Sequence, residues 1–566
     1  MKTLSRRSLT RKLRSFLSNR AGNFAMMTAI AVVPLVGAAG LAVDYATMSR
    51  LRAELQQALD AAVLAVAQKG EDISDAQARE IARAYMTGNI GNAYRNLEIV
   101  RKGTSVTMTA DVDADLAFGG IFGIDKQEVA AASTADIAYA SYEVALVLDT
   151  TGSMRGGKLQ SMKDAVVGMI DDMSGQVKDS DKLKFSLVPF ATFVNVGPEH
   201  GPEFDDKGKI KKGTGAPWLD LKGKVELPER ELLPGLSRFE LYHHLGQKWK
   251  GCVETRYPTR KGNHDVDDTQ PTKRDKNSYF VPTFAIDEPD DRWGRWEIYE
   301  NNYIDDPSLL KKLDVLDNSE KTKKLKIKLK YEAEHLLAGV VPLGDDDDDD
   351  DDKKIPGGGG DGSDVVDGGN GPKIRTDGGR GPNFRCDVEP ITPLTSNYGE
   401  LKRKVREFNA SGTTNILEGV TWGQRVLSPH EPFSEGRPKQ GSDGKIEKIM
   451  VVLTDGANNF GNRNTAYGSS YSSFGYVVDG RLGAVGGSSI TRNKMNEKTL
   501  EACTNAKEDG TIIYTIRLEE PDRATGDMLQ KCASSPGHFF DAPSRSQLKN
   551  VFERIGEDIV KLRLSS

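Results

Sequence analysis

The spacing of apolar and polar positions changes character several times along the 566-residue chain. The first apolar feature is an uncharged run that extends from Asn23 to Val43. About 20 apolar residues in a helix span the hydrocarbon core of a bilayer, and a proline such as Pro34 is tolerated in such a helix. We therefore predict a transmembrane helix over residues 23–43.

Residues 44–140 follow with two other periodicities. Apolar side chains first recur at spacings of three and four residues, which is typical of an amphipathic helix; they are Leu51, Leu55, Leu59, Ala62 and Val66. Gly70 ends this pattern, and a second helical pattern covers Ile73–Met86. Residues 97–138 then alternate with a period of two, which indicates a small antiparallel sheet. The region is predicted to be a helical stalk followed by a small pilin-like α+β module.

Short apolar runs alternate with helical segments in two further regions, residues 141–196 and 389–562. A continuous apolar run such as Val144–Leu148 is typical of a strand buried on both faces. Predicted strands cover 144–148, 185–196, 449–454, 511–518 and 538–542, and predicted helices cover 158–173, 399–408, 415–426, 523–531 and 544–561. Alternating strands and helices favour a doubly wound parallel sheet. The fold class is therefore α/β, with one domain split in two along the chain.

The two halves of this domain are separated by a large insertion, residues 197–343, and by an acidic, glycine-rich loop, residues 344–382. Aromatic residues in the first part of the insertion predict that it packs; they are Trp218, Trp249, Tyr257, Trp293, Trp296, Tyr299 and Tyr303. The loop begins with eight consecutive aspartates, Asp345–Asp352. Such a composition buries too little apolar surface to offset its ordering entropy. We expect residues 344–382 to be disordered.

The distribution of charge predicts how the chain is oriented in a membrane. Seven of the first 20 residues are basic and none is acidic. Basic flanks of membrane helices stay in the cytoplasm, so residues 1–22 are predicted to be a cytoplasmic tail and the chain after Asp44 to be extracytoplasmic. A cleaved signal peptide is the alternative, although the apolar run is longer than a usual signal core. The net charge of −6 argues against a nucleic-acid partner.

The chain contains four cysteines, Cys252, Cys386, Cys503 and Cys532. An even number in an exported protein indicates two disulfides. Three pairings are possible, and we favour Cys503–Cys532, both near the carboxyl end, with Cys252–Cys386, which would bracket the insertion. Four free buried thiols are the alternative. No pair has the C-x-x-C spacing of a redox motif or a zinc knuckle.

The strongest motif for chemistry is Asp149-Thr150-Thr151-Gly152-Ser153, directly after the apolar run 144–148. Open α/β sheets bind ligands at the carboxyl ends of their strands. The turn offers one carboxylate and two hydroxyls, which are hard oxygen ligands that suit Mg²⁺ or Mn²⁺ rather than Zn²⁺. Taken alone, this motif fits an ordinary turn or helix cap equally well.

Two more loops strengthen the prediction of a metal site. Thr414, in Gly412-Thr413-Thr414-Asn415, adds a hydroxyl before a predicted helix. Asp455, in Thr454-Asp455-Gly456, adds a second carboxylate at the end of the predicted strand 449–454. Three loops at the same edge of one parallel sheet could close around one ion. The predicted metal site therefore consists of Asp149, Thr151, Ser153, Thr414 and Asp455.

These three elements, in this order, resemble the metal-ion-dependent adhesion site of von Willebrand factor A domains, over residues 142–196 and about 389–561. The resemblance implies that Thr151 and Ser153 bind the metal through their hydroxyls, and that Thr414 does so directly or through water. It implies that Asp149 and Asp455 hold metal-bound waters. A metal held mainly by neutral hydroxyls stays electrophilic, which would leave one position for an Asp or Glu carboxylate of a partner protein. The alternative is the same fold with a vestigial site.

The amino end carries a second resemblance. The basic tail followed by RAGNFAMMTAIAVVPLVGAAGLAVDYATMSRLRAELQQALDAAVLA resembles the TadE/TadG-like segment of Flp pilus-assembly proteins. The pairing of this segment with an interrupted von Willebrand factor A domain is similar to the TadG-like members. The resemblance implies a single-pass protein of the bacterial inner membrane, with a periplasmic carboxyl-terminal domain that serves the tight-adherence pilus system. Type IV-like prepilins are cut after a Gly with a Glu five residues on; here Gly22 is followed by Met27, so we expect the helix to remain as an anchor.

Two functions are compatible with these patterns. The first is a membrane-anchored pilus-assembly or adhesion protein that holds an acidic group of a partner, and the alternative is a pilin-like structural or tip subunit that displays the adhesion domain. We expect no enzyme, because the chain has no H-E-x-x-H, G-x-S-x-G or P-loop motif. Gly359–Asp367 fits one calcium-binding nonapeptide repeat, and one copy cannot build a β-roll. His243 and His244 are expected to be a surface pair.

Overall fold

The computed structural model describes residues 21–67, 69, 73–102, 105–136, 141–177, 180–258, 265–290, 299–306, 308–331, 365–366, 374–375, 379–441 and 444–561. Residues 1–20 of the predicted basic tail, Trp293, Trp296 and most of the loop 344–382 lie outside these ranges. The chain forms two compact units, Met1–Tyr139 with Arg563–Ser566, and Ala140–Leu562. Each unit is described separately below.

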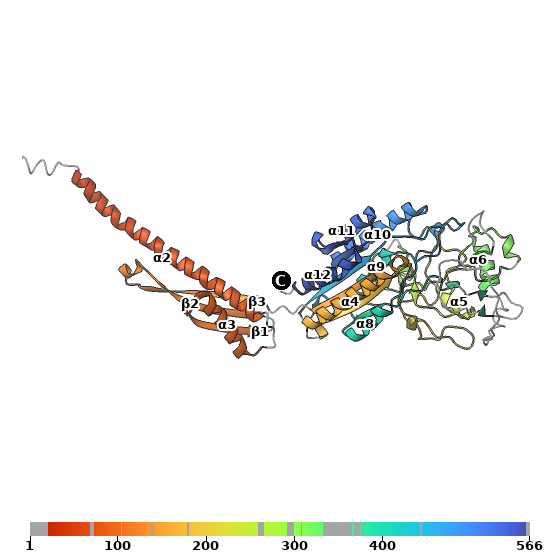
Figure 1. The fold of residues 1–566 in the computed structure, drawn as a ribbon, viewed down its shortest axis with the longest axis horizontal. Coiled ribbons are helices and arrows are strands. Elements are labelled where there is room, and N and C mark those ends of the chain that lie inside the picture. Colours follow the sequence, from red (N-terminus) through yellow and green to blue (C-terminus); the bar gives the residue numbers. More distant parts are fainter. Residues whose placement is uncertain are drawn as a thin grey trace, which may run out of the picture. The chain divides into compact units, whose positions relative to one another are not determined.

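The amino-terminal unit is a long helix packed on a three-stranded sheet (Figure 1). Its elements are α2 (Ala21–Ala67), α3 (Asp75–Ile90), β1 (Tyr94–Lys102), β2 (Ser105–Asp115) and β3 (Lys126–Asp136). The strands are antiparallel in the order β1-β2-β3. The stripe predicted from Leu55, Leu59 and Val66 is buried against Val106 and Met108 of β2. The structure therefore matches the α+β module predicted from the two periodicities.

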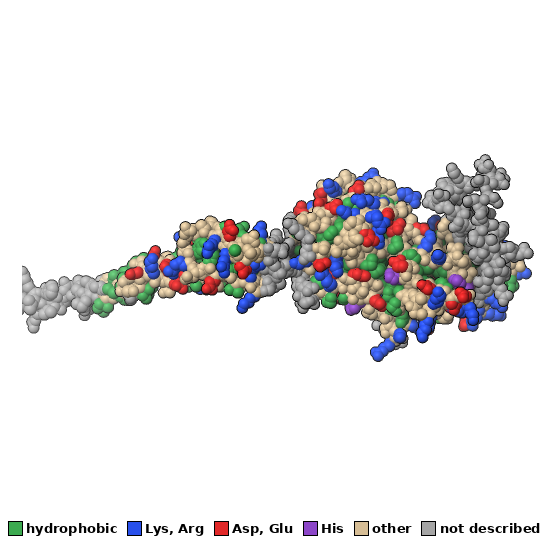
Figure 2. Space-filling view, turned by 90° about the horizontal axis from the view of Figure 1, so that it is seen from below, with side chains coloured by type: hydrophobic (Ala, Val, Ile, Leu, Met, Phe, Trp, Pro, Cys, Tyr) green, Lys and Arg blue, Asp and Glu red, His purple; other side chains and the backbone are tan. Residues whose placement is uncertain are grey.

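Helix α2 continues without a break from the uncharged run into this core. Among the described residues, one helix, over Ile30–Ala67, is long and apolar enough to cross a membrane, with a mean hydropathy of 1.7 in its most apolar window. Large apolar side chains in its first half, such as Val33 and Leu35, are exposed. In Figure 2, green apolar side chains cover the narrow end of this unit, at the left of the view, where the described part of α2 begins. This surface is compatible with a helix that enters a bilayer.

The second unit is built on a mixed sheet with the order β10-β5-β4-β12-β13-β14. These strands cover Thr392–Thr395, Leu183–Phe190, Ser141–Asp149, Gly444–Thr454, Ile512–Leu518 and Phe539–Ala542, in that order. All neighbouring pairs are parallel except the edge strand β10, which runs antiparallel to β5. The chain fills one half of the sheet outward from β4 and the other half outward from β12. The doubly wound α/β fold predicted from the sequence is thereby confirmed.

Helices cover both faces of this sheet (Figure 1). On one face lie α4 (Gly157–Gln176), α8 (Tyr398–Glu407) and α12 (Leu548–Lys561), whose apolar side chains share a core with Val144, Leu146 and Leu148. On the other face lie α9 (Ile416–Leu427), α10 (Ser488–Glu508) and α11 (Arg523–Cys532). Their core includes Ala145 and Val147, the alternate side chains of the same strand. Because β4 is buried on both faces, it reads as the continuous apolar run seen in the sequence.

The insertion extends this second core rather than forming a separate domain. Its helices and strands are short: α5 (Arg238–His244), β7 (Cys252–Val253), α6 (Glu320–Lys326) and a π-helical turn, Ile327–Tyr331. β7 pairs with β6 (Val194–Asn195), which directly precedes the insertion. Trp218 packs edge-on against Phe280 at a ring-centroid distance of 5.9 Å. Phe280 contacts Trp422 of α9 at 5.0 Å. Trp218, Trp249, Tyr299 and Tyr303 all belong to the core that includes α9. The prediction that this part of the insertion packs is therefore confirmed for these residues.

A few short strands complete the described chain. β11 (Gln440–Gly441) pairs with β12, and β8 (Val365–Val366) pairs with β9 (Ile374–Arg375). The last pair falls within the loop predicted to be disordered, residues 344–382. Residues 379–382 of that loop are also ordered, with Gly381 and Pro382 buried, so the predicted disorder extends a few residues too far. The other residues of the loop, including most of the calcium-repeat-like stretch, lie outside the described residues. The cysteines form two disulfides, Cys252–Cys386 and Cys503–Cys532, which are the pairs that the sequence favours.

Four buried charges join the insertion to the loop before α10. Arg481 donates to Glu229 and Glu254 at 2.8 Å each, and Arg238 is 2.8 Å from Glu254. Although burial opposes ionisation, the two guanidinium groups lower the pKa of Glu254 to about 2. Burial raises the pKa of Glu229 to about 7, against the lowering effect of Arg238 and Arg481, and the negative charge of Glu254 adds to the rise. Arg238 and Arg481 thus hold segments together that are more than 200 residues apart in sequence.

Candidate metal centre at the edge of the sheet

The predicted metal-site residues meet where the sheet changes winding direction. Asp149 ends β4, and Thr151 precedes a 3₁₀ turn, Gly152–Met154, that leads into α4. Asp455 directly follows the adjacent strand β12, and Thr414 lies one residue before Asn415, the N-cap of α9. Because β4 and β12 are parallel neighbours, their carboxyl ends share one edge, which is where open α/β sheets bind ligands.

Hydrogen bonds connect four of the five side chains to one another, and Asp149 to the backbone of Thr151. The hydroxyls of Thr151 and Ser153 are 2.9 Å apart, and the Thr414 hydroxyl lies 3.4 Å from that of Thr151. The Ser153 hydroxyl donates to Asp455 Oδ1 at 2.6 Å. Asp149 accepts from the Thr151 backbone N–H at 2.8 Å and from the Thr454 hydroxyl at 2.6 Å. The structure therefore brings together all five residues singled out in the sequence.

The electrostatics of the site favour a cation. Asp149 is fully buried and Asp455 is 3% exposed. Burial, together with the negative charge of Asp455, raises the pKa of Asp149 from 3.8 to about 6. A divalent cation would relieve both effects, because it replaces lost hydration and separates the two carboxylates. Three hydroxyls and two carboxylates fit Mg²⁺ or Mn²⁺ in ligand chemistry.

The loops around the site are fixed by their own backbone contacts. Gly152 N–H donates to the Gly412 carbonyl at 3.1 Å, which ties the first loop to the second. Gly412 has φ +74°, and a Cβ there would lie 2.6 Å from the Thr192 hydroxyl, so the position requires glycine. A Cβ at Gly456 would lie 3.0 Å from the Thr414 hydroxyl. Glycine at these positions lets the three loops approach closely enough to share one ligand.

Lys158 is a component of the site that the sequence analysis missed. Its Nζ lies 2.7 Å from Asp455 Oδ2 and 4.0 Å from Glu519 Oε2. Lys158 lies in the first turn of α4, and its side chain is 21% exposed. No sequence motif includes this lysine. It reaches the site only because the first turn of α4 places its side chain beside Asp455. The Thr454 hydroxyl, which fixes Asp149, was likewise not singled out.

The site is open to the surface on one side. Ser153 is exposed, whereas Thr151 is 1% and Thr414 6% exposed. Within the described ranges, no group of three or more His, Cys, Asp or Glu side chains is arranged to hold a metal. The site at β4 and β12 differs from such groups because hydroxyls supply most of its oxygen atoms. An ion here would keep at least one direction free for an external ligand.

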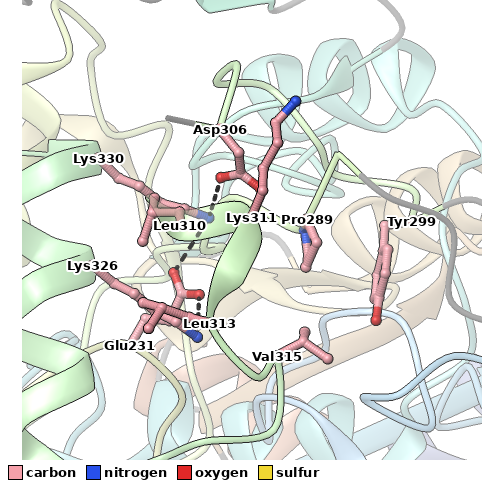
Figure 3. Close-up of a pocket in the computed structure, with 10 residues that line it drawn as sticks. All are labelled: Glu231, Pro289, Tyr299, Asp306, Leu310, Lys311, Leu313, Val315, Lys326 and Lys330. Atoms are coloured by element: carbon pink, nitrogen blue, oxygen red, sulfur yellow. Dashed lines mark ion pairs between the residues drawn. The ribbon is translucent and has the colours of Figure 1, made fainter. Parts of the chain in front are cut away.

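A second candidate site is a cavity of about 170 Å³ in the insertion, shown in Figure 3. Lys326 and Lys330 point into it beside Glu231 and Asp306. Lys326 pairs with Glu231 at 3.2 Å, and Lys330 with Asp306 at 3.3 Å. Lys311, which also lines the cavity, pairs with Asp290 at 3.3 Å. Each lysine of the cavity wall therefore already has a carboxylate partner. The histidine pair is not a site either: His243 is exposed and stacks on Phe204 at 4.6 Å.

The amino-terminal helix is the part of the chain that matches a known family. Residues 22–69 match the family model described as "Putative Flp pilus-assembly TadE/G-like". The protein carries a TadE/G-like segment. This segment covers the uncharged run and the stalk part of α2. None of the curated proteins matches the chain.

Several solved structures are distantly similar to this chain. The pilus adhesin SpaC from Lactobacillus rhamnosus GG is 10% identical, with a TM-score of 0.30, over 83% of this chain and 35% of SpaC. The vWF domain of the type V pili tip protein Mfa5 from Porphyromonas gingivalis is 9% identical, with a TM-score of 0.30, over 74% and 95% of the two chains. The PilB minor pilin from Streptococcus sanguinis is 13% identical, with a TM-score of 0.30, over 83% and 78%. The chain thus spans about a third of the length of SpaC.

Proposed function

We propose that this protein is a membrane-anchored, extracytoplasmic component of a Flp-type pilus system that binds an acidic group of a protein partner through Mg²⁺ or Mn²⁺. The observation that carries the proposal is the convergence of Asp149, Thr151, Ser153, Thr414 and Asp455 at one sheet edge. The TadE/G-like segment supports the pilus context. The role is binding rather than catalysis.

The chemistry of the site supports an acidic partner. Two carboxylates beside a divalent ion leave its charge approximately balanced, and the ligands closest to it would be neutral hydroxyls. Such an ion stays attractive to one more carboxylate, supplied from outside at the exposed Ser153 side. One Asp or Glu of a partner would gain affinity from the interface that surrounds it. 

The topology proposed for the chain follows from its charge distribution. The seven basic residues before the apolar run favour a cytoplasmic amino end. The small sheet of the first unit and the whole second unit would then lie on the extracytoplasmic side of the bacterial inner membrane. Two disulfides in the second unit suit an oxidising compartment such as the periplasm.

The metal proposal is tested by calorimetric titration of Mg²⁺ and Mn²⁺ into the detergent-solubilised full chain, beside its Asp149→Ala variant. Saturable one-site binding that the variant loses is the expected result. Circular dichroism of both proteins shows whether the variant keeps its fold. Absence of binding to the wild-type chain would contradict the proposal and would leave the sheet edge as a vestigial site.

The partner chemistry has its own test. A poly-glutamate peptide should bind the full chain in Mg²⁺ and not in EDTA, and a poly-glutamine peptide should bind in neither. Equal binding of the two peptides in Mg²⁺ would contradict a carboxylate-specific site.

A structural or tip subunit of the pilus is the second candidate, favoured by the continuous helix that packs on the small sheet of the first unit. The two functions differ in where the intact chain resides. Recovery of full-length chain in inner-membrane fractions supports the anchored protein, and recovery in sheared fibres supports the subunit.

A further inference from the structure

The loop between β2 and β3 places apolar side chains where water would surround them. Residues 116–124, Leu-Ala-Phe-Gly-Gly-Ile-Phe-Gly-Ile, contain no charge. Ile121 is 74% exposed and Ile124 is 49% exposed. Leaving such a side chain in water instead of an apolar environment costs about 1.5–3 kcal/mol. Two exposed isoleucines on one short loop therefore indicate a surface that meets an apolar partner.

This loop is fixed to helix α2 by the first charged residue after the apolar run. Asp44 accepts hydrogen bonds from the backbone N–H groups of Ala117, at 2.8 Å, and Phe118, at 3.1 Å. As a result Asp44 is only 3% exposed, although it lies on a helix surface. Backbone donors thus replace water around this carboxylate, which lets it lie at the border of an apolar phase.

Phe118 fixes the loop at a second point, within the apolar run itself. A Cβ on Gly40 would lie 2.5 Å from Cγ of Phe118, so the ring packs directly on the glycine. At a rise of 1.5 Å per residue, Gly40 lies about 6 Å further along the helix than Asp44. The loop consequently overlaps the last turn of the predicted membrane-spanning segment, residues 23–43.

The helix surface at the same level is also apolar. Leu41 and Val43 are 54% and 51% exposed, and Tyr45, just past the apolar run, is 69% exposed. Tyrosine is enriched where membrane helices pass the headgroup layer. Figure 1 shows the tip of the β2–β3 hairpin beside α2, on the side of the sheet from which the helix emerges. Loop and helix therefore present apolar side chains to the same layer.

We propose that residues 117–124 insert into the lipid interface of the extracytoplasmic leaflet beside α2. This inference rests on the proposed membrane anchorage of α2. The first unit is then attached to the bilayer at two points, the helix and the loop. Amphipathic surface elements bury their apolar face about 5–10 Å into this layer, which matches the overlap with Gly40.

The insertion is tested with single environment-sensitive labels on the full chain in phospholipid vesicles. The native cysteines are paired, so Ile121→Cys supplies the one reactive thiol for an NBD label. Leu35→Cys, on the exposed apolar face of α2, is the control for anchorage. Val100→Cys is the control for water; it pairs with Thr107, near the end of β2 away from the loop, and is 45% exposed. Emission is measured together with its quenching by two lipids, one with a nitroxide near the headgroup, for position 121, and one with a nitroxide on the acyl chain, for position 35; position 100 is measured with both.

The expected result is blue-shifted emission and loss of most of the fluorescence by lipid quenching at positions 121 and 35, with neither at position 100. Quenching at 35 without quenching at 121 overturns the loop insertion and leaves the anchor intact. A label at 121 that is blue-shifted but insensitive to quenching lipids places the loop against protein, which also overturns the proposal. Absence of quenching at both 35 and 121 overturns the anchorage itself.

Discussion

Lys158 is the residue whose charge most directly opposes a cation at the sheet edge. Its ammonium group pairs with Asp455 at 2.7 Å, the carboxylate that would hold metal-bound water. A divalent ion must therefore displace this contact or tolerate a positive charge beside it. The affinity of the site for Mg²⁺ should therefore be lower than the five site residues alone would give.

Replacement Lys158→Met should tighten Mg²⁺ binding, since it removes a competing cation and keeps the length of the side chain. A partly exposed ion pair contributes about 1 kcal/mol, which corresponds to roughly fivefold in the dissociation constant. Calorimetric titration measures the change. Lys163→Met is the control, because Lys163 lies on the same helix and donates to the Arg406 carbonyl instead. Weaker Mg²⁺ binding in Lys158→Met would show that the lysine orients Asp455 rather than competing for it.

Asp149 should make the stability of the metal-free protein depend on pH. Its pKa rises from 3.8 to about 6 on folding, so the folded state holds the proton more tightly than the unfolded state. Stability is therefore lost as pH rises from about 4 to 6, and the loss amounts to about 3 kcal/mol. Denaturant unfolding in EDTA should show that Asp149→Asn is more stable than the wild type at pH 7 and equal to it near pH 4.

Other buried carboxylates also titrate in this range, so the difference between the two proteins is the quantity to compare. Saturating Mg²⁺ should abolish the advantage of Asp149→Asn at pH 7, because the ion stabilises the wild-type carboxylate. A difference that stays constant from pH 4 to pH 7 would contradict the assignment to Asp149.

At the scale of elements, buried ion pairs hold the insertion in place where it has little regular secondary structure. Arg481 precedes α10, and its side chain is 1% exposed between Glu229 and Glu254. Replacement Arg481→Met should lower the free energy of unfolding by about 3–5 kcal/mol, because it leaves carboxylates buried without a partner. Denaturant unfolding measures this loss. Arg523→Met is the control, since that side chain is 95% exposed, and no measurable change is expected there. If the free energy of unfolding fell no more in Arg481→Met than in the control, water would have to reach Glu229 and Glu254.

Most elements of the second unit could be predicted, because apolar periodicity reports burial directly. Strand β4 and helix α9 were expected within a few residues of their observed bounds. Helix α10 was missed, since it buries polar residues such as Thr491, Asn496 and Lys498, which interrupt the apolar pattern. The predicted strand 185–196 is broken at residues 191–193, between β5 and β6. Polar side chains satisfied by tertiary hydrogen bonds are invisible to a reading of hydrophobicity alone.

The same limit explains what was and was not foreseen in the candidate site. The five residues lie at strand and helix ends, where the position along the chain dictates the position in space. Lys158 reaches the site across the start of α4, and Glu519 approaches it from the end of β13. Such side-chain approaches depend on the packed fold and leave no periodic signal.

At the scale of the whole molecule, the insertion and the sheet form one core. Trp218 and Phe280 of the insertion share it with Ala145 and Val147 of β4. The insertion thus divides the domain along the chain but not in space. Deletion of the entire insertion should expose the apolar face of α9, and the remaining halves are not expected to fold independently.

The disulfide Cys252–Cys386 has a consequence for the covalent integrity of this core. A protease that cuts the chain anywhere between the two cysteines, the aspartate tract included, produces two fragments that stay joined by the disulfide. Limited proteolysis should therefore give one band of full-length mass on a non-reducing gel and two fragments after reduction. Separation of the fragments without reductant would show that the two cysteines are not paired. A nicked molecule would keep both halves of its sheet, and with them the site at β4 and β12, so a cut in the acidic loop would leave a working protein with four chain ends.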